Sequence, residues 1–173
     1  MSKLTGWLGF LVVCSISVAQ AQVPVAPNPD HESMLQSKDP QLAKNKRLVY
    51  DFWREVFEAA HMDLAPKYMT ETYIQHNPLV ATGRQPFIDF FSRIRKPAPI
   101  EARVKAPLVA MLADGDLVTM AFAREYPDPQ DPEKRYTTTW FDMFRIVDGK
   151  IAEHWDPAIK SAKPAAPAAP AKQ

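Results

Sequence analysis

The sequence is poor in cysteine and glycine and carries almost no net charge. One cysteine, Cys14, and 5 glycines occur in 173 residues. Lys and Arg number 21 and Asp and Glu number 20, so no excess of positive charge indicates a nucleic-acid partner. No P-loop, GxGxxG or GxSxG pattern occurs, so nothing indicates a phosphate-binding loop or a serine hydrolase.

The first 21 residues show the pattern of a secretory signal peptide. Lys3 precedes an apolar run, and Ala19 and Ala21 supply the small residues of a cleavage site. We therefore predict cleavage after Ala21 and a secreted or periplasmic protein, with an uncleaved N-terminal anchor as the alternative. Cleavage would remove Cys14, which excludes disulfides, cysteine nucleophiles and cysteine-ligated zinc. No later segment is apolar enough to span a bilayer, so no membrane association is expected after cleavage.

The remaining length fits one domain with tails. Prolines number 17, and many lie outside the regions that could form a core. Residues 22–38 read as a Pro-rich linker, and residues 160–173 read as a disordered Ala/Pro tail. The folded domain is therefore expected over residues 39–159.

Hydrophobic spacing within that domain changes from helical to alternating. The carboxylate of Asp39 followed by Pro40 is a helix start, and Asp63 can cap a second, short helix. The periodicity predicts helices over residues 40–60, 64–69 and 84–95, and strands over residues 102–112, 117–126, 136–147 and 151–155. Helices followed by an antiparallel meander indicate an α+β fold.

The last predicted hairpin can close in two registers around Asp148 and Gly149. A two-residue loop pairs Val147 with Lys150, whereas a three-residue loop with a glycine bulge pairs Val147 with Ile151. The bulged register places opposite charges across the ladder and apolar residues beside apolar residues, so we choose it.

The bulged register sorts the hairpin side chains onto two faces. One face carries Trp140, Asp142, Phe144, His154 and Asp156. The other carries Phe141, Met143, Arg145, Ile151, Glu153 and Trp155. Two carboxylates among aromatics cannot both ionise cheaply, so one of them is expected to have a raised pKa. Such a cluster suits general acid/base chemistry, although His154 and Asp156 could instead cap the strand end in solvent.

A second polar cluster follows the short helix. Tyr73, Gln75, His76 and Asn77 offer hydroxyl, amide and imidazole groups, and Arg84 begins the third helix. His76 is either a site residue or an ordinary turn residue. A zinc site from His76, His154 and Asp156 lacks metal-motif spacing, so no metal and no cofactor are predicted.

These residues carry a resemblance to a known family. The helical start, the YIQHNP turn (residues 73–78) and the closing segment FDMFRIVDGKIAEHWD (residues 141–156) resemble the SnoaL-like polyketide cyclases of the nuclear-transport-factor-2-like superfamily. The resemblance covers residues 39–159 and is closest to the subgroup of predicted aldol-condensation catalysts. It implies a cone-shaped fold, with three helices on a curved antiparallel sheet, and a homodimer formed through the outer sheet face.

The resemblance also implies roles for particular residues. Asp156 matches the acid/base aspartate on the last strand of the cyclases. Asp142 falls where those cyclases carry a histidine, so the chain departs from their pattern there.

We expect a cofactor-independent enzyme that removes a proton next to a carbonyl in a small apolar substrate. The expected catalytic residues are Asp156, His154, Asp142 and His76. The expected substrate-binding residues are Tyr73, Asn77, Arg84, Trp140 and Phe144. The alternatives are a non-catalytic ligand-binding domain and a dimerising scaffold of the same fold.

Overall fold

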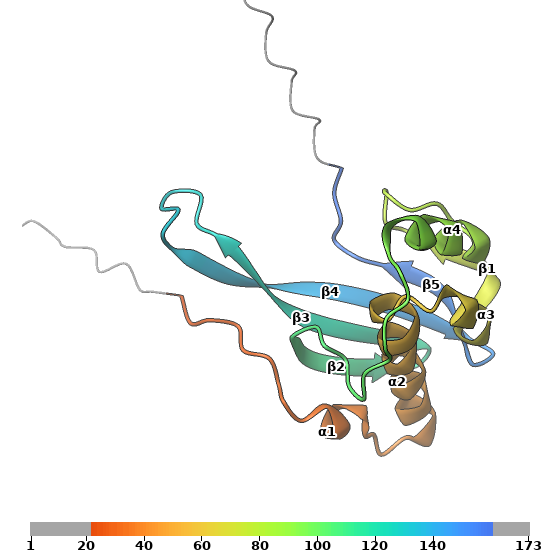
Figure 1. The fold of residues 1–173 in the computed structure, drawn as a ribbon. Coiled ribbons are helices and arrows are strands. Elements are labelled where there is room, and N and C mark those ends of the chain that lie inside the picture. The colour runs from red at the N-terminus through yellow and green to blue at the C-terminus, as the bar shows by residue number, and fades with distance from the viewer. Residues whose placement is uncertain (1–21, 161–173) are drawn as a thin grey trace, which may run out of the picture.

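The computed structural model describes residues 22–160. Helices fill most of its first half and strands most of its second half (Figure 1). The helical elements are α1 (His31–Leu35), α2 (Pro40–Phe52), η1 (Trp53–Glu58), η2 (Met62–Leu64), α3 (Ala65–Tyr68) and α4 (Arg84–Ile94). The strands are β1 (Met69–Gln75), β2 (Leu108–Asp114), β3 (Leu117–Pro127), β4 (Arg135–Val147) and β5 (Lys150–Trp155).

The first long helix begins as the sequence predicts. The side chain of Asp39 accepts hydrogen bonds from the backbone N–H groups of Gln41 and Leu42, and Pro40 occupies the first turn. The predicted helix to residue 60 is α-helical only to Phe52 and continues as the π-helix η1. The wider winding of η1 brings Trp53 beside Glu58, five residues later. The Nε1–H of Trp53 donates to Glu58 Oε1 at 3.1 Å.

The other helices match the prediction less closely. The short helix predicted over residues 64–69 is a 3₁₀ turn, η2, followed by α3, and the side chain of Asp63 does not cap it. The third predicted helix is present as α4 and ends one residue early, at Ile94.

The sheet is mixed rather than wholly antiparallel as predicted. Its order is β1-β5-β4-β3-β2, and β1 pairs with β5 in parallel. The sequence pattern predicts no strand over residues 69–75, where β1 lies. It also begins the first predicted strand too early, since β2 starts at Leu108. Pairing between β1 and β5 joins segments about 80 residues apart, which local alternation cannot reveal.

The β4–β5 hairpin combines features of both registers. Asp148 and Gly149 have φ of 50° and 70° and form a two-residue turn, so Val147 pairs with Lys150 rather than with Ile151. The extra residue lies further along, because Ile146 pairs with Ile151 whereas Arg145 pairs with Glu153. Beyond the bulge, Arg145 pairs with Glu153, Phe144 with His154 and Met143 with Trp155, as the bulged register requires. Ile151, expected on the outer face, is instead fully buried.

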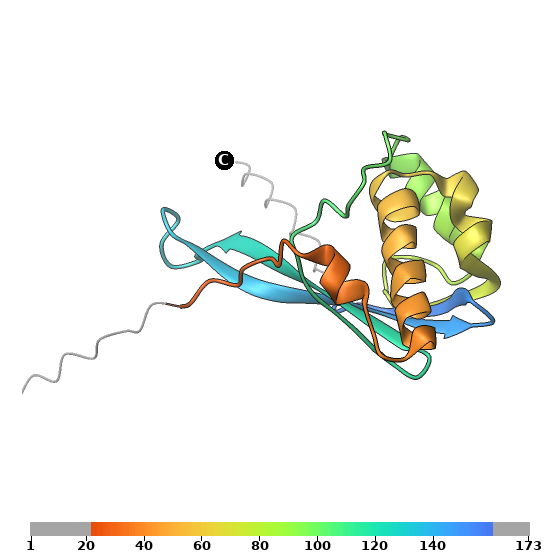
Figure 2. The ribbon, with the colours of Figure 1, turned by 90° about the horizontal axis from the view of Figure 1, so that it is seen from below.

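The helices α2, α3 and α4 lie over one face of the sheet (Figure 2). The β3–β4 ribbon extends beyond them, away from β1 and β5 (Figure 1). The core between the layers includes Val49 and Val56 from the helices and Leu108, Val118 and Met120 from the sheet, all fully buried. Burial of these apolar side chains holds the helices on the sheet.

The segment expected to be a linker packs against the domain instead. It contains α1, in which His31 and Leu35 are buried. The His31 Nδ1 lies 2.8 Å from the hydroxyl of Tyr50, and the backbone N–H of Asn28 donates to the carbonyl of Leu108. The sequence does not indicate this contact. The segment is Pro-rich, and a buried histidine in so short a stretch gives no periodic signal.

The predicted signal peptide (residues 1–21) and all but the first residue of the predicted tail (residues 160–173) lie outside the described residues. Between residues 22 and 160, no helix combines the length and the hydrophobicity needed to cross a bilayer.

Candidate active site

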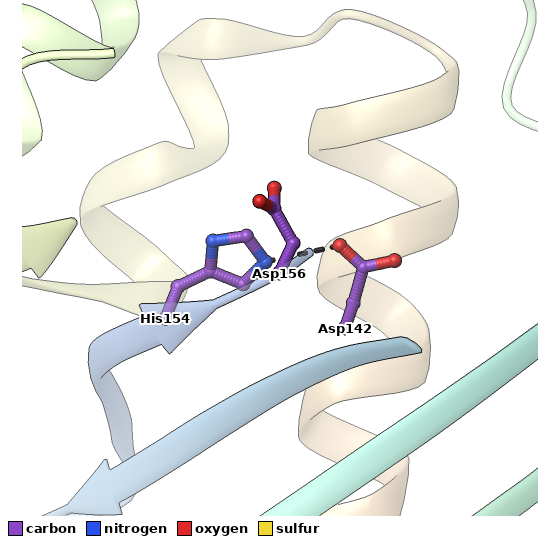
Figure 3. Close-up of side chains that lie close together, drawn as sticks. All are labelled: Asp142, His154 and Asp156. Carbon is purple, nitrogen blue, oxygen red and sulfur yellow. Dashed lines mark hydrogen bonds and ion pairs between the residues drawn. The ribbon is translucent and has the colours of Figure 1, made fainter. Parts of the chain in front are cut away.

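Three ionisable side chains meet on the inner face of the β4–β5 hairpin. Asp142 lies on β4, His154 lies on β5, and Asp156 directly follows β5 (Figure 3). Phe144 pairs with His154 on the neighbouring strand, so both side chains lie on the face predicted for them. Asp142 and His154 are only 4% and 7% exposed, so their partners are protein groups rather than bulk water.

The hydrogen bonds of His154 fix the position of one proton. Its Nδ1 lies 2.8 Å from Gln75 Oε1. The same Oε1 accepts the backbone N–H of Asn77 at 3.0 Å, which orients the Gln75 amide with its oxygen toward His154. Because an amide oxygen can only accept, the Nδ1 of His154 must carry a proton.

A second proton must lie between His154 and Asp142. The Nε2 of His154 is 3.1 Å from Asp142 Oδ1. With Nδ1 protonated, a neutral imidazole has only a lone pair at Nε2, and a carboxylate oxygen has no hydrogen to donate. Either His154 is an imidazolium or Asp142 is a carboxylic acid. A hydrogen bond between these two atoms therefore needs one hydrogen shared by His154 and Asp142.

The other oxygen of Asp142 is buried without a hydrogen-bond partner in residues 22–160. Among the described residues, no donor reaches the buried Oδ2. A buried oxygen without a hydrogen bond is costly to the folded state.

Asp156 is held at both of its carboxylate oxygens. The amide Nδ2 of Asn77 donates to its Oδ2 at 2.7 Å, and the backbone N–H of Ala158 donates to its Oδ1 at 2.9 Å. Both partners are donors, so Asp156 accepts a hydrogen bond at each of its carboxylate oxygens.

Tyr73 supplies a hydroxyl donor. Its oxygen accepts a hydrogen bond from Gln75 Nε2 at 3.0 Å, and in residues 22–160 no acceptor is found for its own proton. Burial, followed by the negative charges of Asp156 and Asp142, raises the pKa of Tyr73, so the hydroxyl keeps its proton at neutral pH.

These groups line an apolar cavity of about 230 Å³. Its polar groups gather at one end, and aromatic rings from the helices form most of the remaining wall. The lining residues include Phe52, Trp53, Phe57, Phe87, Phe90, Phe91 and Phe144 with Tyr73, Gln75, Asn77, Asp142, His154 and Asp156. An apolar cavity with a few convergent polar groups is typical of a small-molecule site.

The two aspartates and the histidine of the site also carry atoms that could ligate a divalent cation. Asp142, His154 and Asp156 each offer one ligand atom, and these atoms lie within 4.8 Å of one another. A cation bound by all three would have to replace the hydrogen bond between His154 and Asp142. His76, considered in the sequence as a zinc ligand with His154 and Asp156, is not part of this group.

Three residues expected at the site do not line the cavity. His76 lies on the outer face, where its Nε2 is 2.7 Å from Glu153 and its ring stacks on Trp155 with centroids 4.8 Å apart. Arg84 donates to the carbonyl of Met69. Trp140 lies farther along β4, with the guanidinium carbon of Arg124 over its ring at 5.2 Å.

Gln75 is the site residue to which the sequence reading gave no role. It orients His154 and also contacts Tyr73 and the backbone of Asn77. The available signal was alternation: residues 73, 75 and 77 point to the cavity, whereas His76, between them, points outward.

Comparison with known proteins identifies the domain. Residues 49–154 match the family described as the SnoaL-like domain. This chain belongs to the SnoaL-like family. The match covers the end of α2, the helices from η1 to α4 and most of the sheet, and it ends at His154. No curated protein matches the sequence.

Solved structures resemble the SnoaL-like domain at low sequence identity. A proposed polyketide cyclase from Acidithiobacillus ferrooxidans is 17% identical over 70% of this chain and 89% of its own, with a TM-score of 0.48. A LEH-like epoxide hydrolase from M. tuberculosis is 16% identical over 68% and 84%, with a TM-score of 0.48. A nuclear-transport-factor-2-like protein of unknown function from Mesorhizobium loti is 18% identical over 72% and 98%, with a TM-score of 0.47.

Proposed function

We propose that the domain is a cofactor-independent enzyme that removes a proton next to the carbonyl of a small, mostly apolar substrate. The observation that carries this proposal is the division of proton roles within one cavity. Asp156 accepts hydrogen bonds at both oxygens, whereas His154 and Asp142 share a proton. Groups whose surroundings favour opposite protonation states are the usual acid and base of such a reaction.

The steps follow from these positions. The Asp156 carboxylate removes the α-proton, and the C–H electrons move into an enolate. The hydroxyl of Tyr73 donates a hydrogen bond to the enolate oxygen, which stabilises the developing charge. In an aldol-type closure, the enolate carbon bonds to a second carbonyl carbon, and the resulting alkoxide takes the proton of the His154–Asp142 pair. Transfer of the proton on Asp156 back to that pair restores the starting state.

The cavity supports an apolar substrate. The aromatic wall offers no charge and few hydrogen bonds, while the polar end can bind one or two oxygen atoms. Proton transfer of this kind contributes about 10² to 10⁴-fold to rate. The same cavity would also suit a non-catalytic binding domain, which would bind carbonyl compounds without exchanging their α-protons.

The direct test is α-proton exchange in D₂O, followed by ¹H NMR over a set of small ketones and aldehydes. Exchange catalysed by the wild-type protein and lost in Asp156→Asn supports the proposal. Asp114→Asn is the matched control, because Asp114 is an exposed carboxylate at the β2 turn.

We also propose that the domain acts after export and as a homodimer. The signal-peptide pattern of residues 1–21 supports export, and N-terminal sequencing of the mature protein should then begin at Gln22. The outer sheet face supports a dimer, because Phe141 and Leu112 are 51% and 67% exposed there.

A further inference from the structure

A second hollow of about 490 Å³ lies on the other side of Trp53 and Phe57, which line both spaces. Its apolar wall is continuous. The ring of Trp53 stacks on Phe122 with centroids 4.6 Å apart and lies 4.4 Å from the ring of Phe57. Pro107 adds to this wall from the segment before β2.

Two guanidinium groups line the same hollow. Arg95, just after α4, has its guanidinium carbon 4.2 Å from the centroid of Phe57 and donates to the carbonyl of that residue. Arg124, on β3, lies over Trp140. Neither arginine makes an ion pair with any residue from 22 to 160, and their remaining N–H donors are open to a ligand.

The two acidic residues that also line the hollow are already engaged. Glu58 accepts the N–H groups of Trp53, Lys105 and Ala106. Glu125 forms an ion pair with Arg135. The donors to Glu58 are uncharged, so its carboxylate offsets one of the two arginines at a distance, and Arg95, Arg124 and Glu58 together leave one net positive charge in the hollow.

We propose that this hollow binds an organic acid, with its carboxylate at Arg95 and Arg124 and its apolar body against Trp53 and Phe57. Guanidinium groups bind carboxylates through paired N–H donors, and the aromatic wall gains energy by covering alkyl or aryl groups. The site is separate from the Asp156 cavity, so it does not depend on the proposed reaction.

The test is calorimetric titration of the purified protein at low salt with hexanoate, 1-hexanol, acetate and inorganic phosphate. Hexanoate should bind about tenfold more tightly than 1-hexanol, because the alcohol lacks the charge, and about tenfold more tightly than acetate, because acetate lacks the chain. Binding should move the indole NMR signals of Trp53 and Trp140.

Arg124→Met and Arg95→Met should each weaken hexanoate binding about fivefold to tenfold. Arg124 is exposed, so its replacement should leave the fold intact even if Arg95→Met does not. Arg93→Met is the matched control, because Arg93 is an exposed arginine in the last turn of α4 and does not line the hollow.

Equal binding of hexanoate and 1-hexanol, or hexanoate binding unchanged in Arg124→Met, would overturn the proposal. Acetate or phosphate binding as tightly as hexanoate would also overturn it, because the aromatic wall would then contribute nothing. The readout is binding, so a failure of the proposed catalysis cannot be mistaken for a failure of this site.

Discussion

The donors and acceptors around His154 determine what the cavity can do chemically. Gln75 requires a proton on Nδ1, and the contact with Asp142 requires a second proton. Asp156, two residues later, receives only donors. Two neighbouring carboxylates therefore occupy opposite roles because of their partners rather than their residue type.

The shared proton can be tested with Asp142→Asn. The asparagine amide can donate to a neutral Nε2 of His154, so the variant should fold with a stability change of about 1 kcal/mol or less. It should lose the transferable proton and with it about 10²-fold of the rate of any step that protonates an alkoxide.

The measurement is ¹⁵N NMR of His154 in both proteins. Nδ1 should appear as a protonated nitrogen in each, whereas Nε2 in the variant should appear as an unprotonated nitrogen that accepts the asparagine amide. An unprotonated Nδ1 in the wild type at neutral pH would contradict the assignment.

Removal of the Tyr73 hydroxyl should affect rate more than folding. Tyr73→Phe takes away the proposed donor to the enolate oxygen, so α-proton exchange should fall about 10²-fold. Stability should change by about 1 kcal/mol, since one hydrogen bond from Gln75 is lost. Tyr136→Phe, on the projecting ribbon, is the control and should exchange normally. Full activity in Tyr73→Phe would remove this residue from the mechanism.

The strands explain which parts of the site the sequence could predict. Alternation along β4 and β5 placed Asp142, Phe144 and His154 on one face, as the structure confirms. The turn was predicted with the wrong length, but a bulge before Glu153 restores the register of the site residues. The shorter turn and the bulge each shift the register by one residue, in opposite directions, so the two shifts cancel. No local sequence pattern fixes the position of the bulge.

β1 was not predicted because its evidence is tertiary. Its backbone pairs in parallel with β5, which places Gln75 beside His154. From the sequence alone, without that pairing, nothing distinguishes Tyr73 from His76 as the residue that lines the cavity. The strand sends Tyr73 inward and His76 outward, where Glu153 and Trp155 hold it.

The N-terminal segment should make the stability of the domain pH-dependent. Burial, followed by the charge of Arg103, lowers the pKa of His31 below 6.5. The folded state therefore binds this proton less readily than the unfolded chain. The free energy of unfolding should be unaffected by His31 above pH 6.5, decrease as the pH falls below 6.5, and level off below the folded-state pKa.

Denaturant unfolding at several pH values measures this effect. His31→Gln should remove its contribution to the acid-dependent loss, whereas the control His61→Gln should retain it. A pH profile in His31→Gln identical to that of the wild type would show that His31 does not contribute to the loss of stability in acid.

Between residues 22 and 160, the helices cover one face of the sheet and leave its other face open (Figure 2). Phe141 and Leu112 are exposed on that outer face. If the face pairs with a second copy, light scattering of the wild-type protein should give twice the mass of one chain. Phe141→Glu should give the single-chain mass, because a charge would be buried in the interface, and Phe141→Leu should not. A wild-type monomer at high concentration would refute the dimer.

The central claim is that the cavity holds a working base, and α-proton exchange in D₂O tests it most directly. The wild-type protein should catalyse deuterium incorporation next to the carbonyl of at least one small apolar ketone or aldehyde, with or without a chelator. Asp156→Asn should fold normally and lose about 10² to 10⁴-fold of that rate, while Asp114→Asn keeps it. Exchange by Asp156→Asn at the wild-type rate would contradict the account.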